Sequence, residues 1–282
     1  MTRAFALLVL AACGGYVDRQ AASTTLKILD GSQRAATQLA DVELARDAMA
    51  GGIVQLAAFA FAYPDEPRFA EMHADAVCDY ATAFVFDAWE DATLAHRADE
   101  VQATADRLRV LLPECIALET ARLPQHGTAA SLRPADVPAA LAIARARAVQ
   151  LALAPLAGLA QLPDLRALLE RCAALRPGFH DADAELLLGT LAANLSTFTH
   201  GPDGSEWFAK AHERAGDGVL LVDVMRARAL DAAHGDRAAF EATLTAVISA
   251  DLSRWPQHRL ANALAVRKAR RYLAHADDLF TR

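Results

Sequence analysis

The apolar residues are spaced most regularly between Leu165 and Leu195. Apolar positions recur there at helical spacing, first up to the Pro177-Gly178 pair and then from about Ala182, and this spacing is typical of amphipathic helices. Proline cannot continue a helix, and a Pro-Gly pair favours a tight turn. The pattern therefore predicts two helices joined by a turn, and much of the remaining chain repeats this unit in an irregular form.

The other helices are predicted from the same spacing, with breaks at proline, glycine and acidic clusters. One helix begins at Val137, and the others span about residues 42–62, 68–88, 98–111, 113–123, 205–215, 218–233, 236–250 and 257–275. Asp87 to Asp91 is predicted to be an acidic loop. Residues 151–160 are almost wholly apolar, so we expect them to be buried on all sides, with an interruption at Pro155.

No strand alternation is visible, so the sequence predicts an all-α protein of about eleven or twelve helices. The abundant Ala, Leu, Arg and Glu are strong helix formers. A single helix pair cannot bury its apolar face, and neighbouring pairs must stack to form a continuous core. We therefore expect irregular tetratricopeptide-like helical repeats in one curved domain over residues 41–282.

The N-terminus has the features of a bacterial lipoprotein signal peptide. Arg3 precedes a short apolar run, and Leu10-Ala11-Ala12-Cys13 fits a lipobox, in which the cysteine is acylated. We favour this interpretation of residues 1–13 over a cytosolic helix with a chance cysteine. Residues 14–40 are then a tether and polar lead-in with a turn at Asp30-Gly31-Ser32. Because no stretch reaches the roughly 20 apolar residues of a membrane span, the lipid on Cys13 is the expected membrane anchor.

Charge and cysteine content narrow the remaining classes of function. The net charge of −7 argues against nucleic-acid binding, which needs a clustered basic face. Besides Cys13, the chain has Cys78, Cys115 and Cys172, so at most one disulfide can form among these three. All three lie in helical patterns without metal-site spacing, and we interpret them as small buried residues rather than as a redox or metal site.

No motif for catalysis or for cofactor or metal binding appears, so we expect neither an enzyme nor a bound cofactor or metal. Two groups could still contact other molecules. Arg267, Arg270 and Arg271 share one helical face, which is more simply a solvated face than a docking patch for an acidic partner. Tyr80 and Phe84 could line a ligand channel, but aromatic residues at helical spacing more often belong to the core.

Several segments, in this order, resemble one known family. They are Asp41 to Ala48, the aromatic-rich Cys78 to Val85, Ala135 to Ala139, the region of Leu168 to Gly189, and Arg259 to Ala265 with Lys268 to Arg271. Together they cover most of the chain, roughly 41–275. With the lipobox before them, they resemble the T component (TatT) of tripartite ATP-independent periplasmic (TRAP) transporters. Each segment is weakly specific, and their order carries the resemblance.

The resemblance implies a non-enzymatic lipoprotein facing the periplasm, with a cryptic tetratricopeptide-like fold. It would associate with the solute-binding P component, could form a homo-oligomer, and would bind or pass a hydrophobic or organic-acid ligand. Thr82 and Leu141 to Ala144 replace aromatic residues common in the family, which would alter the walls of any channel. The alternative is a stand-alone carrier or scaffold lipoprotein that binds an apolar small molecule.

Overall fold

The chain folds almost entirely into helices. The computed structural model describes residues 2–124, 128–199 and 201–280, with the side chains of 2–18 and 197–199 excluded. Helices make up 85% of it, and these residues contain no strand, which confirms the all-α prediction. The α-helices are α1 (Thr2–Thr37), α2 (Val42–Ala62), α3 (Pro67–Asp79), α4 (Phe86–Leu94), α5 (Ala98–Arg122), α6 (Val137–Leu153), α7 (Pro155–Gly158), α8 (Leu162–Leu175), α9 (Phe179–Thr199), α10 (Ser205–Ala215), α11 (Leu220–Arg226), α12 (Arg237–Ile248), α13 (Arg259–Ala274) and α14 (Ala276–Phe280).

Shorter helical segments join several of these helices. Two are π-helical: η1 (Tyr80–Val85) links α3 to α4, and η5 (Ala227–Asp231) follows α11. The 3-10 segments are η2 (Ala129–Ser131), η3 (Pro134–Asp136), η4 (Leu159–Gln161), η6 (Leu252–Arg254) and η7 (Pro256–His258). The predicted helix pair is present as α8 and α9, with the turn at Pro177-Gly178 between them.

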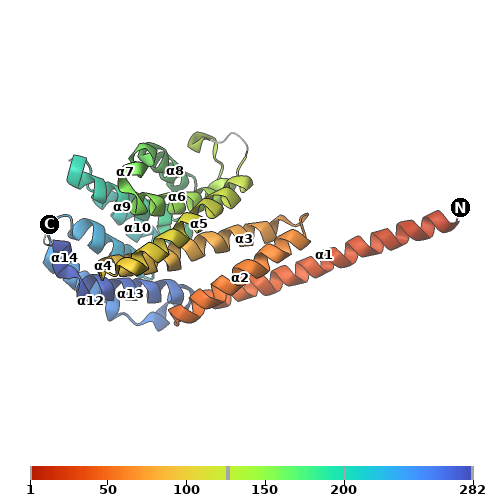
Figure 1. Cartoon of the computed structure of the whole chain (residues 1–282), viewed down its shortest axis with the longest axis horizontal. Helices are drawn as coiled ribbons and strands as arrows, with labels where there is room; N and C mark the ends of the chain where they lie inside the picture. Colours follow the sequence, from red (N-terminus) through yellow and green to blue (C-terminus); the bar gives the residue numbers. More distant parts are fainter. Residues whose placement is uncertain (1, 125–127, 200, 281–282) are drawn as a thin grey trace.

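Each helix packs mainly on its neighbours in the sequence, and the C-terminal helices also meet the N-terminal ones. In Figure 1, α1 projects from one side of the molecule, and α13 lies beside α4, with which it shares ion pairs. Helix α13 contacts α1 and α2 as well as α11 and α12. Helices from opposite ends of the sequence are therefore in contact, unlike those of an open solenoid.

The buried apolar residues form a series of clusters that share helices. One cluster joins α2 to α6, the next joins α6, α8 and α9, and two more continue through α9 to α11 and α11 to α13. Phe69, Phe208, Phe240 and Tyr272 are among the largest side chains that are fully buried. Since each pair of helices shares its apolar side with the next pair, the core extends along the whole helical array.

Local sequence explains several helix boundaries. The Asp41 carboxylate accepts hydrogen bonds of 3.0 Å from the backbone N–H groups of Glu43 and Leu44, so it caps α2, which begins at Val42 as predicted. Gly204, with φ of 84°, precedes α10, and a Cβ there would lie 2.4 Å from the carbonyl oxygen of Gly189. Only glycine fits this close approach of α10 to α9.

Three predicted breaks lie within helices, so these local predictions are wrong. Asp30-Gly31-Ser32 lies inside α1 rather than in a turn, and the predicted acidic loop lies inside α4. The carboxylates of α4 are paired with Arg271 of α13, which offsets their mutual repulsion within the helix. Pro113 lies within α5, where the buried Leu112 and Cys115 hold the flanking turns in the core.

The helix break at Pro155 is confirmed, but the burial predicted for residues 151–160 is wrong. Leu156 is 88% exposed and Leu159 is 51% exposed, because α7 and η4 form a short excursion on the surface. Helix α2 also differs from expectation. By length and composition it is a candidate membrane span, and only 11% of its apolar window is buried.

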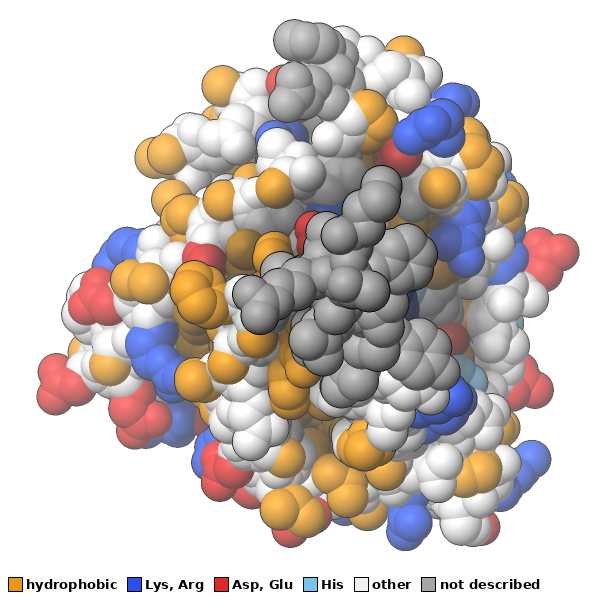
Figure 2. All heavy atoms as spheres, turned by 90° about the vertical axis from the view of Figure 1, so that its right-hand side faces the viewer, with side chains coloured by type: hydrophobic (Ala, Val, Ile, Leu, Met, Phe, Trp, Pro, Cys, Tyr) orange, Lys and Arg blue, Asp and Glu red, His pale blue; other side chains and the backbone are white. Residues whose placement is uncertain are grey.

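Large apolar side chains of both α1 and α2 are exposed. Ile28 of α1 and Leu44, Val54 and Phe61 of α2 are among the exposed large hydrophobic residues. Figure 2 views the molecule from the side on which α1 projects, and hydrophobic side chains lie there between charged ones.

Candidate functional site

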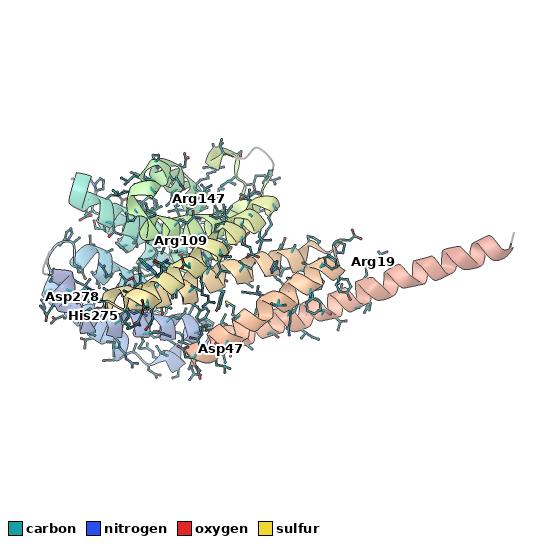
Figure 3. All side chains as sticks on the ribbon, in the orientation of Figure 1. Arg19, Asp47, Arg109, Arg147, His275 and Asp278 are labelled. Carbon is teal, nitrogen blue, oxygen red and sulfur yellow. A yellow bond between two sulfur atoms is a disulfide. The ribbon has the colours of Figure 1, made fainter. Side chains whose placement is uncertain are left out.

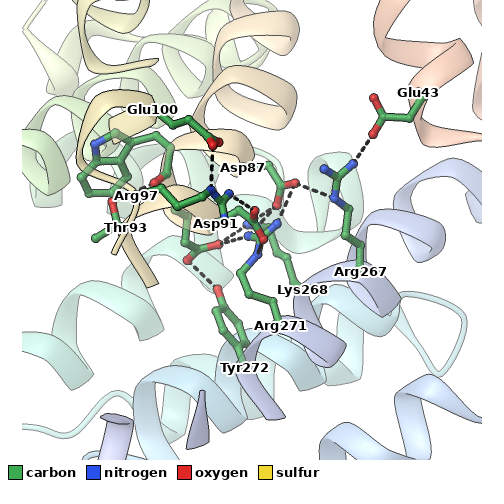
Figure 4. A network of polar contacts seen from close by, with 12 residues as sticks. Glu43, Asp87, Asp91, Thr93, Arg97, Glu100, Arg267, Lys268, Arg271 and Tyr272 are labelled. Atoms are coloured by element: carbon green, nitrogen blue, oxygen red, sulfur yellow. Dashed lines mark hydrogen bonds and ion pairs between the residues drawn. The ribbon is translucent and has the colours of Figure 1, made fainter. Parts of the chain in front are cut away.

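The basic residues of α13 face an acidic patch on α4 and make a charge network inside the molecule. Arg271 donates hydrogen bonds to the Asp87 carboxylate at 3.0 Å and to Asp91 at 2.8 Å (Figure 4). Lys268 contacts the Glu90 carboxylate at 2.7 Å and Asp87 at 3.1 Å. The network therefore joins residues about 180 positions apart, as the sequence separations of 178 and 184 show.

The pairs keep these groups ionised although they are buried. Burial alone would raise the pKa of Asp87, but Lys268 and Arg271 outweigh it and hold that pKa below its ordinary value. Burial likewise works against the charged form of Lys268, and Glu90 and Asp87 outweigh it and raise the Lys268 pKa. Removing one member would leave a buried charge without its partner, which is costly.

This geometry corrects the prediction for the three arginines. Arg271 is only 6% exposed and bonds to internal carboxylates, so it cannot dock a partner. Arg267 is half-buried and contacts Glu43 at 2.7 Å, which attaches α13 to α2. Arg270 is exposed, so it is the most accessible member of the predicted docking patch.

The two aromatic residues proposed for a channel lie in the hydrophobic core. Tyr80 and Phe84 are buried in η1, with ring centroids 6.2 Å apart, and pack in the cluster of α2 to α6. Arg107 donates a 2.8 Å hydrogen bond to the Tyr80 hydroxyl. Neither residue lines the two surface cavities described below, so the core interpretation fits both.

Cys78 of α3 and Cys115 of α5 form a disulfide, with a sequence separation of 37. The interpretation as small buried residues is confirmed for these two, and the one disulfide that the sequence allows forms because the fold brings their Cα atoms to 4.9 Å, within disulfide range. The same interpretation holds for Cys172, which is free and buried, and burial raises the pKa of its thiol to about 11.

A buried carboxyl group lies beside this disulfide. Glu119 is fully buried, with Oε1 at 3.8 Å from the Cys78 Sγ atom. Arg122 contacts both Glu119 at 2.7 Å and Asp75 at 2.8 Å. Burial, with a further contribution from Asp75, raises the Glu119 pKa to about 8 despite Arg122. The side chains between α3 and α5 are therefore held both by a disulfide and by the hydrogen-bonded triad of Asp75, Glu119 and Arg122.

Two surface cavities are described. One, of about 490 Å³, lies between α10 and α11 and is lined by residues that include His212, Asp223 and Arg226. The other, of about 260 Å³, lies beside α7 and is lined by Leu151, Gly158 and Arg147, which is labelled in Figure 3. Among the residues the structure describes, no group of three or more His, Cys, Asp or Glu side chains is arranged to hold a metal ion.

Other sequence predictions have different outcomes. Cys13 lies in α1, but its side chain is outside the described part, so lipidation stays a prediction.

The acidic partners of α13 were not predicted from the sequence. A signal was present, because Asp87, Glu90 and Asp91 repeat the three- and four-residue spacing of Arg267, Lys268 and Arg271, and such faces can pair across two helices.

Comparison with known proteins identifies the family. No curated protein matches the chain. The sequence profile of the TRAP transporter T-component matches residues 38–280, from just before α2 to the end of α14. That range includes the charge network, the disulfide and both cavities, so the match extends over the whole helical domain. The chain therefore belongs to the TRAP transporter T-component family.

Proposed function

We propose that the protein is a non-enzymatic, lipid-anchored accessory component of a TRAP transporter that faces the periplasm and associates with the solute-binding P component. The observation that carries this proposal is the family match over residues 38–280. A transporter component of this family works in the bacterial cell envelope. The proposal adds an orientation, an anchor and a partner.

Two features support the periplasmic orientation. The Cys78–Cys115 disulfide is of a kind that persists in oxidising compartments such as the periplasm and is rare in the cytosol. The N-terminal sequence before Cys13 has the order of a lipoprotein signal peptide. Since lipidation at Cys13 attaches acyl chains, it would provide membrane binding without a transmembrane helix.

The helical array supports a role in protein association. Consecutive helices pack as neighbours and share core clusters, which is the arrangement expected for irregular tetratricopeptide-like repeats. Such arrays present long surfaces to partner proteins. Arg270 is an exposed basic residue of α13, and we propose it as a contact for an acidic patch on the partner.

The association is tested by purifying the protein from membranes and identifying what accompanies it. We expect the solute-binding protein of a TRAP system to co-purify, and Arg270→Glu to weaken its recovery without changing the melting temperature. The matched control is Arg254→Glu, which reverses a charge on η6. Absence of any solute-binding protein from the wild-type preparation would refute the association.

The anchor has a separate test. Cys13→Ala should move the protein from the membrane to the soluble fraction, because acylation needs the cysteine. Cys172→Ala is the matched control, since Cys172 is buried and unlinked. Retention of Cys13→Ala in the membrane fraction would contradict lipidation at this residue.

A second function, a stand-alone carrier of an apolar small molecule, is favoured by one observation. The 490 Å³ cavity between α10 and α11 has an apolar floor and lies within the size range of small-molecule sites. Ligand handling is also compatible with an accessory role in uptake. Native mass spectrometry after mild extraction should reveal a bound small molecule, and a consistently empty protein would exclude the carrier function.

A further inference from the structure

The groove between α10 and α11 combines an apolar floor with charged side chains of both signs. Phe208, Val222 and Leu230 form the floor and are buried in their own right. Asp223 and Arg226 of α11 lie at the rim and are each about one third exposed, at 32% and 36%. Residues three apart on a helix lie on the same side, so the carboxylate and the guanidinium stand next to each other along the groove.

Neither charge is fully satisfied by its protein partners. Asp223 faces the His212 ring at 3.8 Å, which is beyond hydrogen-bond distance. Arg226 donates a 3.1 Å hydrogen bond to the Thr243 hydroxyl, and its contact with Asp231 is long, at 3.4 Å. Both groups line the groove and therefore keep hydrogen-bonding capacity for a ligand there.

Asp231 behind Arg226 is a weak counterion. It is 6% exposed, and its Oδ2 atom is buried without a hydrogen-bond partner among the described residues. Burial raises the pKa of Asp231 above its ordinary value, although Arg226 works in the opposite direction. The guanidinium charge of Arg226 is therefore only partly compensated within the protein.

The backbone at this position is also irregular. Leu230 and Asp231 belong to the π-helical segment η5, which begins directly after Arg226. One π turn inside an α-helix widens the hydrogen-bond ring, and such turns are frequent at functional sites. Here the wider turn carries a floor residue of the groove and the buried carboxylate next to Arg226.

From this geometry we propose that the α10–α11 groove binds a zwitterionic amino acid with an apolar side chain. The ligand carboxylate would pair with the Arg226 guanidinium, the ammonium with the Asp223 carboxylate, and the side chain would cover Phe208 and Leu230. Guanidinium–carboxylate pairs form charge-assisted hydrogen bonds. A simple organic anion would be repelled by Asp223, and a simple amine by Arg226.

The role of such a ligand in uptake rests on the proposed function, whereas the binding itself does not. Binding is measured on the purified full-length chain by isothermal titration calorimetry with L-leucine. Two analogues each lack one charge: 4-methylpentanoate has no ammonium, and 3-methylbutylamine has no carboxylate. We expect leucine to bind and each analogue to bind at least about tenfold more weakly, as the loss of one charged hydrogen bond predicts.

Substitutions then assign each charge to its residue. Arg226→Gln should abolish the preference for leucine over 3-methylbutylamine, and Asp223→Asn should abolish the preference over 4-methylpentanoate. Asp217→Asn is the matched control, because Asp217 also contacts His212, at 3.6 Å, but is 92% exposed and does not line the groove. It should leave the affinity for leucine unchanged.

Several outcomes would overturn the proposal. They are no leucine binding at millimolar concentration, binding of both analogues as tight as that of leucine, or an unchanged preference in both groove variants. If Arg226→Gln does not fold, the analogue series on the wild-type chain and Asp223→Asn still decide. Because binding is measured without any partner protein, its failure is distinct from failure to co-purify the solute-binding protein.

Discussion

Neighbouring arginines on α13 have different environments. Arg270 is exposed, whereas Arg271 is buried and bonds to Asp87 and Asp91. Helical periodicity places Arg270 and Arg271 at neighbouring positions around α13. It does not say how much of that surface α4 covers. The boundary between solvent and interior falls between these two residues, and α4 sets it.

Truncation should therefore affect the two arginines differently. Arg271→Ala should lower the free energy of unfolding by about 3–5 kcal/mol, because it leaves buried carboxylates without their cation. Arg270→Ala should change it by less than about 0.5 kcal/mol, as at an exposed position. Chemical denaturation monitored by circular dichroism measures both values, and equal effects would contradict the internal network.

Glu119 predicts how stability depends on pH. Its pKa is raised in the folded chain to about 8, above the ordinary value near 4.5, so the folded state holds this proton more tightly than the unfolded state. Stability from this group is complete below about pH 4.5 and declines as the pH rises toward 8, because proton release then favours unfolding.

Glu119→Gln should remove this decline, since an amide does not titrate. Melting temperatures measured between pH 5 and pH 8 should fall more steeply for the wild type than for the variant. Asp75→Asn is a useful comparison, because Asp75 contributes to the shift but is more exposed. Parallel pH profiles for wild type and Glu119→Gln would show that Glu119 titrates normally.

At the scale of elements, α3 and α5 are joined by a covalent bond as well as by polar and apolar contacts. The disulfide, the Glu119 triad and the buried Leu108 and Leu112 all lie along this contact. A cross-link stabilises chiefly by restricting the unfolded chain, so its effect depends on the 37-residue separation of the two cysteines.

The combined substitution Cys78→Ala and Cys115→Ala should reduce the free energy of unfolding by about 2–4 kcal/mol. Reductant should destabilise the wild type to a similar extent and leave the double variant unaffected. Cys172→Ala should remain sensitive to reductant, because it retains the disulfide. A wild type that does not respond to complete reduction would contradict a stabilising role of the bond.

At the scale of the molecule, α13 connects the two ends of the array. It packs on α11 and α12, contacts α1 and α2, and pairs with α4 through Lys268 and Arg271. Because these contacts span most of the chain, local opening of α13 should loosen the N-terminal half as well.

Hydrogen exchange measured by mass spectrometry tests this coupling. Lys268→Met should increase exchange in α13 and also in residues 86–94 of α4, which lose a counterion for Asp87 and Glu90. Lys210→Met is the control, because Lys210 pairs with Glu206 on the surface of α10. A change confined to α13 would contradict long-range coupling.

Periodicity and helix-stop residues are local properties, so the sequence alone determined the all-α class, the α8–α9 pair and the start of α2 at Asp41. Its ordered segments also indicated the family to which the chain belongs. A family resemblance is found by comparing residues in order along the sequence, so it does not depend on which helices pack together.

Only the tertiary structure decided which residues pair across the chain. Arg271 meets α4, Cys78 meets Cys115, and Asp223 and Arg226 of α11 lie along a groove with α10. The same packing keeps Pro113 inside α5. These outcomes depend on burial and on partners up to 184 positions away, whereas spacing along one helix reports only its own faces.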